Sequence, residues 1–416
     1  MSGLSRRSLL AGVGAAALLT PLVGCSAPPG ARNSLELFQF KSEAIALFDE
    51  ICERFNAANP GLPPVRQNFQ ADNVTALRVR LVKGDTPDLI TINGDYAFGS
   101  LAHSGVFLDF APTGILEPVS PAIAEILPTL GRGGPAEVNG LPFANNGSGF
   151  IYNRDIFDEH GLTPPATWDE LIAIADELTG RGVDAFYWGF KDNWTGAPMF
   201  SSISGNVLGG QVAGWYERRR AGETSFKELM PVLERMLQIA EYGNSNRFEI
   251  GYNDGNQGFA QGRAAMYVHG TYAIPAIRSY NPDIQLGTFA TPADRPEDTW
   301  VVSGVDVALT CGPQPPAGVL EFFSHLMQEE NMAAYCAEQV AFPTRAGMRA
   351  SDPALEGLMP YFEQQRLTTY SDHNFPQAVN LNNYMQQFLI ERDAAAFART
   401  LDTQWDKVID RLNSTI

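Results

Sequence analysis

Residues 150–180 read FIYNRDIFDEHGLTPPATWDELIAIADELTG and place a helix after a strand. The apolar start of this stretch, residues 150–153, predicts a short strand. Thr167 and Glu170 have the spacing of a capping box, in which each side chain accepts a hydrogen bond from the backbone amide of the other residue. The helix that they begin runs to about Thr179 and ends at Gly180. A strand followed by a helix is the repeating unit of α/β proteins.

The same alternation recurs along the chain. Residues 35–40 read as a strand, and Ser42 is a suitable N-cap for a helix that ends at Asn59-Pro60-Gly61. Further segments complete the pattern: strands at 88–92, 186–190, 264–268 and 301–310, a turn at 93–96 with a short helix after it towards His103, helices at 226–242 and 255–261, mostly helix after 322, and a loop at 143–149. This order predicts an α/β fold with a parallel or mixed sheet covered by helices.

Composition and charge narrow the class of protein. The 416 residues are 44% hydrophobic, 11% aromatic and 18% charged, which is typical of a globular chain. The length is too great for one ordinary core and predicts two domains. The net charge of -18 argues against binding to nucleic acid or to anionic lipid.

The N-terminus carries the features of an exported lipoprotein. Arg6-Arg7 and the uncharged residues 9–24 resemble a twin-arginine signal, and this apolar run is too short to span a membrane. Leu22-Val23-Gly24-Cys25 resembles a lipobox, in which the cysteine is lipidated and becomes the first residue. We therefore expect a signal peptide at 1–24, a lipid on Cys25 and a tether at 25–33. The alternative is an ordinary cleaved signal with a chance cysteine.

The other cysteines leave two possibilities open. Cys311 and Cys336 can form a disulfide that leaves Cys52 free, or all three are buried thiols. No cysteine or histidine spacing indicates a zinc site, and we expect neither a metal nor a cofactor.

Several motifs occur in an order that resembles one protein family. They are GDTPDL at 84–89, NGLP at 139–142, IYNRDIF at 151–157, TWDEL at 167–171, FAQGRAAM at 259–266 and Phe342-Pro343. Together they are similar to the extracellular solute-binding proteins (family 1) of bacterial ATP-binding-cassette (ABC) sugar importers, the group of maltose-binding protein. The resemblance covers nearly the whole chain after the tether.

This resemblance implies a fold and a function. The fold is the two-lobed type II periplasmic-binding fold with its ligand in the interlobe cleft. Lobe 1 comprises residues 34–144 and 302–345, and lobe 2 comprises 145–301 and 346–416. The protein is expected to be a monomer without enzyme activity, lipid-anchored at the outer face of the cell membrane. It is expected to bind a carbohydrate, an oligosaccharide or similar polyol, and to deliver it to the transmembrane subunits of a permease.

Candidate ligand-binding residues combine this resemblance with the chemistry of sugars. Aromatic faces pack against the C–H side of a sugar ring, while amides and carboxylates bind its hydroxyls. In open α/β sheets such groups follow the strands. The candidates are Lys41, Asn93, Asp95, Tyr96, Asn145, Asn146, Asp192, Asn193, Trp194, Gly270, Tyr272, Asp306, Arg345 and Asn380. The resemblance itself implies contacts at 93–96, at Asn146 and in the platform at 192–194.

Each candidate also has a purely structural interpretation. Asp95 is suited to cap a helix, Asn146 to form a hinge turn, Trp194 to pack in a core and Arg345 to lie in solvent. Where the family commonly has tryptophan two residues after a glycine, this chain has Tyr272, so the sugar preference of a relative does not carry over.

Two other functions remain as alternatives. A glycerophosphodiester or another nutrient on the same fold would need a cationic pocket, for which Lys41 and Arg345 are the main candidates. A secreted glycoside hydrolase would need two paired carboxylates, and nothing in the sequence singles out a pair. A nucleophile elbow and a His-Glu-x-x-His motif are both absent from the sequence.

Overall fold

A computed structural model of the protein describes residues 34–130 and 137–414. The strands are β1 (Leu35–Gln39), β2 (Val65–Phe69), β3 (Leu89–Ile92), β4 (Leu141–Asn153), β5 (Asp184–Phe186), β6 (Ala264–Gly270), β7 (Leu286–Phe289), β8 (Val301–Thr310), β9 (Phe342–Pro343) and β10 (Leu367–Thr368). In the described chain they form one sheet in the order β2-β1-β3-β8-β4-β6-β5, with β10 beside β8, and β7 and β9 beside β4. Pairing is parallel between β1 and β3 and antiparallel between β3 and β8, so the sheet is mixed, as predicted.

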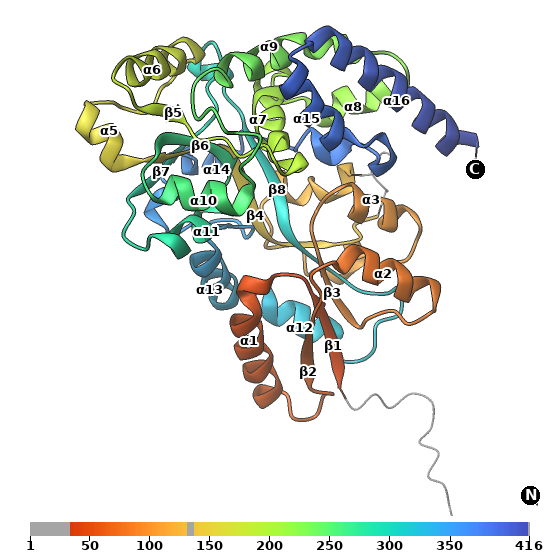
Figure 1. The fold of residues 1–416 in the computed structure, drawn as a ribbon. Helices are drawn as coiled ribbons and strands as arrows, with labels where there is room; N and C mark the ends of the chain where they lie inside the picture. Colours follow the sequence, from red (N-terminus) through yellow and green to blue (C-terminus); the bar gives the residue numbers. More distant parts are fainter. Residues whose placement is uncertain (1–33, 131–136, 415–416) are drawn as a thin grey trace, which may run out of the picture. The chain divides into compact units, whose positions relative to one another are not determined.

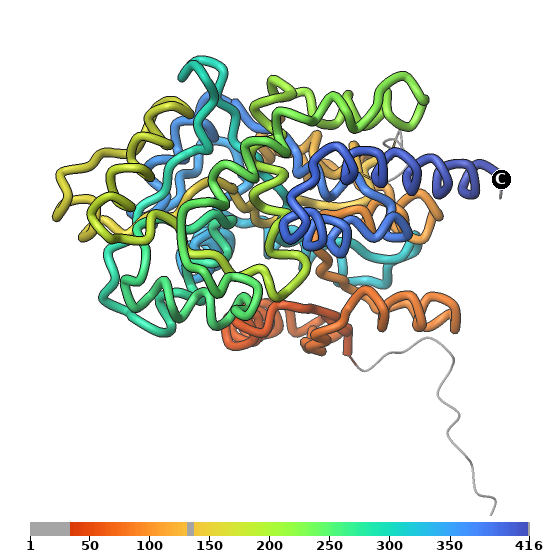
Figure 2. The backbone as a smooth tube through the Cα atoms, turned by 45° about the horizontal axis from the view of Figure 1, so that its top comes forward, coloured from red at the N-terminus to blue at the C-terminus, as the bar shows by residue number. Residues whose placement is uncertain are grey.

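Helices cover this sheet (Figure 1). They are α1 (Ile45–Ala58), α2 (Asn73–Val82), α3 (Tyr96–His103), α4 (Pro121–Ala124), α5 (Arg154–His160), α6 (Trp168–Gly180), α7 (Ala197–Val207), α8 (Val212–Arg220), α9 (Met230–Ile239), α10 (Tyr252–Ala260), α11 (Ala273–Tyr280), α12 (Val319–Leu326), α13 (Glu329–Gln339), α14 (Met359–Glu363), α15 (Leu381–Glu391) and α16 (Ala394–Ser414). Figure 2 shows the C-terminal helices, drawn in blue, beside the green segment that holds α7 and α9, although more than 140 residues separate α9 from α15.

The apolar side chains form separate cores at the two ends of the long central strands. One core takes its residues from 35–144 and 305–341. The second takes its residues from 150–408, and a third lies beside it with residues from 151–358. Strand β4 passes from the first core to the others: Leu141–Ser148 pairs mainly with β8, and Ser148–Asn153 pairs with β6 and β7. The lobe boundaries given above stay a prediction.

The capping box that starts α6 is confirmed. The Thr167 hydroxyl accepts a hydrogen bond from the amide of Glu170 at 3.3 Å, and the Glu170 carboxylate accepts one from the amide of Thr167. Strand β8 has the predicted bounds.

Three local predictions were wrong. The strand expected at 186–190 is instead β5 at Asp184–Phe186, and residues 187–190 are not a strand. Residues 143–149 are not a loop but the middle of β4, and all of them are buried. Their amide and glycine-rich sequence hid this strand. Ser42 does not cap α1, because a 3-10 helix at Ser42–Ala44 precedes it and makes Ala44 the N-cap residue. The Ser42 hydroxyl donates instead to Glu43.

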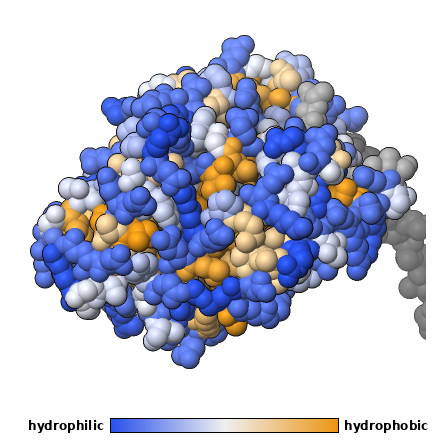
Figure 3. Space-filling model, turned by 90° about the horizontal axis from the view of Figure 1, so that it is seen from above, coloured by the Kyte–Doolittle hydropathy of each residue, from blue (hydrophilic) through white to orange (hydrophobic). Residues whose placement is uncertain are grey.

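The features predicted at the N-terminus lie outside the described residues: the signal peptide, the lipidated Cys25 and the tether. None of the helices within 34–130 and 137–414 is long and apolar enough to cross a membrane. The face in Figure 3 is mostly hydrophilic, with smaller groups of apolar side chains among the charged and polar ones.

The cysteines of the described chain are free thiols. Cys52, Cys311 and Cys336 are all buried, and no disulfide joins Cys311 to Cys336. Burial raises the pKa of the Cys52 and Cys311 thiols to about 12, so both stay protonated and unreactive at neutral pH.

Candidate functional site

A cavity of about 330 Å³ lies where β4 and β8 meet segments that follow β1, β3, β6 and β10. Most of its polar residues follow or belong to strands, and Asn382 lies on α15. Its aromatic residues lie in η4 (Asn193–Gly196) and in segments that follow β1, β6 and β10. The lining residues are Phe40, Lys41, Asn93, Asn146, Trp194, Ala197, Pro198, Tyr272, Gly304, Val305, Asp306, Tyr370, Asp372, His373 and Asn382.

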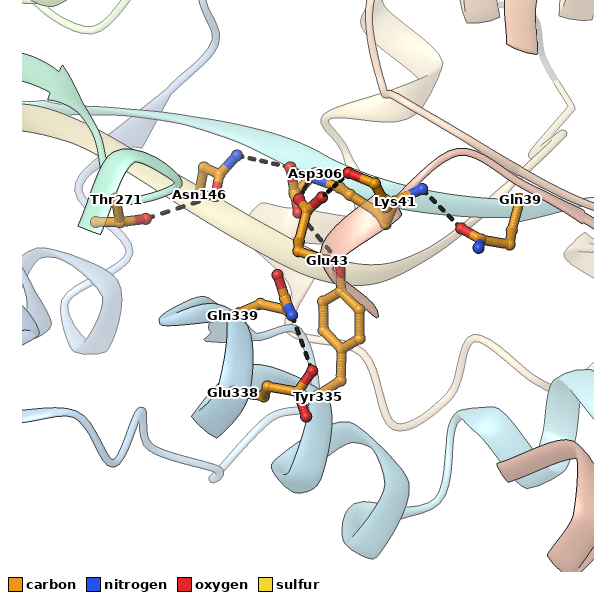
Figure 4. Close-up of polar contacts among 10 residues, drawn as sticks. Gln39, Lys41, Glu43, Asn146, Thr271, Asp306, Tyr335, Glu338 and Gln339 are labelled. Atoms are coloured by element: carbon orange, nitrogen blue, oxygen red, sulfur yellow. Dashed lines mark hydrogen bonds and ion pairs between the residues drawn. The ribbon is translucent and has the colours of Figure 1, made fainter. Parts of the chain in front are cut away.

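Asp306 is the centre of the polar wall (Figure 4). One of its carboxylate oxygens accepts hydrogen bonds from the Lys41 ammonium at 2.6 Å and from the Asn146 amide at 2.9 Å. The other accepts from the Tyr335 hydroxyl at 3.4 Å. Thr271 in turn donates to the Asn146 carbonyl at 3.5 Å, so the orientation of that amide is set from both sides.

The charge of this wall is nearly balanced. Lys41 is the only lysine or arginine in the lining, and its side chain is 12% exposed against 8% for Asp306. Glu43 adds a second carboxylate 3.8 Å from the Lys41 ammonium. Because its charge is already compensated, Lys41 offers little free positive potential to a ligand.

A second group of lining residues is aromatic. Trp194 and Tyr272 both remain partly exposed in the cavity, and behind them lies the buried ring of His269. The His269 ring centroid is 5.8 Å from that of Trp194, 5.4 Å from Tyr252 and 6.2 Å from Tyr272. Burial lowers the pKa of His269 to about 3, so the histidine is neutral and supports the cavity as an aromatic ring.

A third group of residues closes the cavity beside Gly304. The Tyr370 ring stacks on His373 with centroids 4.6 Å apart, and its hydroxyl is hydrogen-bonded to that of Ser148 at 2.6 Å. A Cβ atom at Gly304 would lie 2.7 Å from the Tyr370 ring, so glycine is needed for this close approach. Asp372 accepts a hydrogen bond from the Ser201 hydroxyl, and no ion-pair partner is found for it in the described chain.

The structure brings six of the predicted residues together in this cavity. They are Lys41, Asn93, Asn146, Trp194, Tyr272 and Asp306. They come from segments up to 265 positions apart, as the contact between Lys41 and Asp306 shows. Whether these residues bind a ligand stays a prediction.

Four predicted residues from the segments 93–96 and 192–194 do not line the cavity. Asp95 caps α3 by accepting hydrogen bonds from two backbone amides, and Tyr96 is the first residue of that helix. The Asp192 carboxylate accepts from the backbone of Tyr252 at 2.7 Å. The Asn193 amide donates to Asn383.

The other four predicted residues also do not line the cavity. Asn145 points away from Asn146 on the strand, and its amide donates to Ser303 at 2.8 Å. A Cβ atom at Gly270 would lie 2.3 Å from the Tyr272 ring, so this ring already fills the space above the glycine. Asn380 has a left-handed backbone before α15. Arg345 lines a separate groove.

Sequence reasoning missed the segment from Tyr370 to His373. Strand β10, which precedes it, is only Leu367–Thr368 and is too short to give an alternating apolar pattern. The cluster of tyrosine, aspartate and histidine in TTYSDH at 368–373 was the available signal. No group of three or more potential metal ligands from histidine, cysteine, aspartate and glutamate occurs within 34–130 and 137–414.

Comparison with known proteins identifies a family and several relatives. The model of the family described as bacterial extracellular solute-binding protein matches residues 41–333. A "multiple sugar-binding protein" of Streptococcus mutans serotype c is 27% identical over 336 residues, which are 79% of this chain and 76% of that protein. The sn-glycerol-3-phosphate-binding periplasmic protein UgpB of Escherichia coli (strain K12) is 23% identical over 311 residues, 69% of this chain and 68% of that protein.

Solved structures share the fold. The structure described as SBP RafE in complex with raffinose superposes with a TM-score of 0.76 and 23% sequence identity, over 90% of this chain and 99% of that chain. The apo form of RafE from Streptococcus pneumoniae gives a TM-score of 0.77 with 22% identity, over 91% and 99% of the two chains.

Proposed function

The chain belongs to the bacterial extracellular solute-binding proteins and has their type II fold, and from this premise we propose that it captures a carbohydrate for an ABC importer. The ligand is an oligosaccharide or a similar polyol, bound in the cavity between β4, β8 and the segments around Trp194, Tyr272 and Tyr370. The bound form is recognised by a membrane permease, and no bond is made or broken.

The observation that carries this proposal is that one cavity holds both aromatic rings and polar side chains. Partly exposed Trp194 and Tyr272 offer faces to the C–H side of a sugar ring. Asn93, Asn146 and Asp306 offer amide and carboxylate groups suited to hydroxyls. The name of the Streptococcus mutans relative and the raffinose bound to RafE support a carbohydrate as the ligand.

A phosphate-containing ligand is the second candidate, because UgpB is also a relative. The charge of the cavity argues against it: the single lysine of the lining is paired with Asp306 at 2.6 Å, and Asp372 adds a further negative charge. A phosphodiester would need an unpaired cation at this place.

The proposal extends to location and to mechanism. Lipidation of Cys25, export through a twin-arginine signal and a tether at 25–33 would keep a monomeric protein at the outer face of the membrane, beside its permease. Ligand binding would stabilise the form in which both lobes contact the solute, and the permease would recognise this closed form.

A titration tests the proposed function directly. Purified protein is titrated with mono- and oligosaccharides and with glycerophosphodiesters, and melting temperature and calorimetric heat are measured. We expect saturable binding of at least one carbohydrate, unchanged on recovery, and no binding of the phosphodiesters. Hydrolysis of the sugars without any rise in melting temperature would contradict the proposal.

Two variants locate the binding site. Trp194→Ala and Tyr272→Ala should each weaken carbohydrate binding by about tenfold or more, since each removes a stacking face. Tyr280→Ala is the matched control, because Tyr280 is 46% exposed at the end of α11 and lies outside the cavity. If both cavity variants kept the native affinity, with melting temperatures near that of the native protein, the carbohydrate would bind at another site.

A further inference from the structure

A second cavity, of about 380 Å³, lies on the other face of the central strands. Its walls are largely apolar and include Pro121, Ile123, Phe342, Met348, Met359 and Phe362. We call it the rear groove. It shares no residue with the cavity proposed to bind carbohydrate.

The alternation of side chains along β4 separates the two cavities. Asn146 lines the carbohydrate cavity, whereas a Cβ atom on Gly147 would lie 3.2 Å from Phe342 and from Phe362. Successive residues of a strand face opposite sides of the sheet. The rear groove therefore lies behind the strand that carries Asn146, and its inner wall is the stacked pair Phe342 and Phe362, with ring centroids 3.6 Å apart.

One charged group of the rear groove has no counter-ion. Arg345 lines the groove and is partly exposed, and its guanidinium has no hydrogen-bond or ion-pair partner within the described residues. Arg349 lies nearby but is paired with Glu363 at 2.5 Å. The charges of Arg349 and Glu363 cancel, so the lining has a net charge of +1 from Arg345. The net charge of the whole chain is -18.

We propose that the rear groove binds a small amphipathic anion, an aryl or alkyl carboxylate. Its apolar body lies against Phe342, Met359 and Phe362, and its carboxylate accepts two hydrogen bonds from the Arg345 guanidinium. This geometry suits a carboxylate because the planar fork of arginine matches two coplanar oxygens. A single unpaired cation beside apolar walls favours a monoanion with a hydrophobic body over an inorganic phosphate.

The site is independent of the proposed carbohydrate binding, so it is tested with a separate probe. We choose 4-phenylbutyrate, with 4-phenylbutyramide as the uncharged probe of nearly the same shape. Binding to the native protein is measured by saturation-transfer NMR and by calorimetry. We expect saturable binding of the carboxylate with a Kd of about 1 mM or tighter, and binding of the amide at least about tenfold weaker.

Three variants assign the probe to the rear groove. Arg345→Gln should weaken binding of the carboxylate about tenfold, since it removes a charged hydrogen-bond donor. Arg66→Gln is the matched control: Arg66 is exposed on β2, outside the groove. Trp194→Ala should also leave binding of the probe unchanged, because Trp194 lines the carbohydrate cavity.

The outcomes are distinct. Equal affinity of carboxylate and amide, equal affinity in Arg345→Gln and native protein, or no saturable binding of the carboxylate would each overturn the proposal. Loss of probe binding in Trp194→Ala would assign the probe to the carbohydrate cavity and would also overturn it. None of these results bears on whether the protein binds carbohydrate.

Discussion

At the scale of single residues, Asp306 connects the most distant parts of the site. Lys41, Asn146 and Tyr335 all donate to its carboxylate, and the Asp306 side chain is 8% exposed. A buried charge that loses its partner destabilises the fold more than the loss of a surface ion pair does. Asp306 is therefore expected to matter for stability as well as for binding.

Asp306→Asn should lower the free energy of unfolding by about 3 kcal/mol, because it leaves the Lys41 ammonium almost buried and without its closest counter-ion. Urea unfolding followed by circular dichroism measures the change. Asp372→Asn is the control, since Asp372 lines the same cavity without an ion-pair partner in the described chain, and it should cost less than about 1 kcal/mol. Similar losses in the two variants would refute the role of Asp306.

His269 predicts a pH dependence of stability. Its pKa is about 3 in the folded protein and ordinarily about 6.5, so between these values the unfolded chain binds a proton that the folded protein does not. The corresponding stability is fully present above about pH 6.5 and is lost as the pH falls towards 3. At pH 5 the loss amounts to about 2 kcal/mol.

Urea unfolding of native protein and His269→Phe at pH 7 and pH 5 measures this loss. The variant cannot titrate at this position, so its stability should fall by about 2 kcal/mol less between the two pH values. This comparison of the change in stability between pH 7 and pH 5 holds even where the variant is less stable at both pH values. Parallel slopes would show that His269 is protonated at its ordinary pKa.

At the scale of elements, β4 and β8 support the site because β8 is buried along its whole length and β4 at every residue except Tyr152. Their pairing sets Asn146 opposite Gly304, two residues before Asp306. Glycine at 304 leaves room for the Tyr370 ring, which brings the segment after β10 onto β8. The strand β10 itself pairs in parallel with β8, Leu367 with Val301 and Thr368 with Val302.

Gly304→Ala should displace the Tyr370 ring, because the new methyl group would lie 2.7 Å from it. We expect a loss of about 1–3 kcal/mol of stability together with weaker carbohydrate binding. Gly312→Ala, just beyond β8, is the control: its Cβ atom would lie 3.4 Å from Thr86, an ordinary contact. Thermal unfolding and calorimetry measure both quantities, and a native-like Gly304→Ala would contradict this account of the site.

At the scale of the whole described chain, the cavity is bounded by elements packed on different cores. Arg78 on α2 donates to Gln377 at 3.2 Å across this division, from an element of the first core to the segment before α15. The contact is exposed, and such contacts contribute little individually. The contact nevertheless joins the two sides of the cavity, one packed on the first core and the other on the second.

Arg78→Ala should weaken carbohydrate binding about twofold, because it removes a contact that favours the arrangement in which both sides line the cavity. Lys83→Ala is the control, since Lys83 follows the same helix and is exposed. Calorimetric affinities of the native protein and both variants test this expectation. Equal affinity in Arg78→Ala and native protein would show that the contact does not assist binding.

The sequence by itself predicted the strands β1, β3, β6 and β8, the capping box of α6 and six residues of the cavity lining. These follow from local periodicity, from capping chemistry and from a set of ordered motifs. It did not reveal that 143–149 is a strand, because a strand rich in amides and glycine has no apolar pattern to detect. It also assigned Arg345 to the cavity, whereas the pairing of Arg345 with Val119 beside β9 places it at the rear groove.

Only the tertiary structure decided which of the polar residues after strands share a cavity. Asn145 and Asn146 are equivalent in sequence, yet successive residues of β4 face opposite sides, so one donates to Ser303 and the other to Asp306. The segment from Tyr370 to His373 joins the site through contacts with β4 and α7 that lie more than 150 positions away. Such contacts are set by the packing of the whole chain around β4 and β8, and no local pattern encodes them.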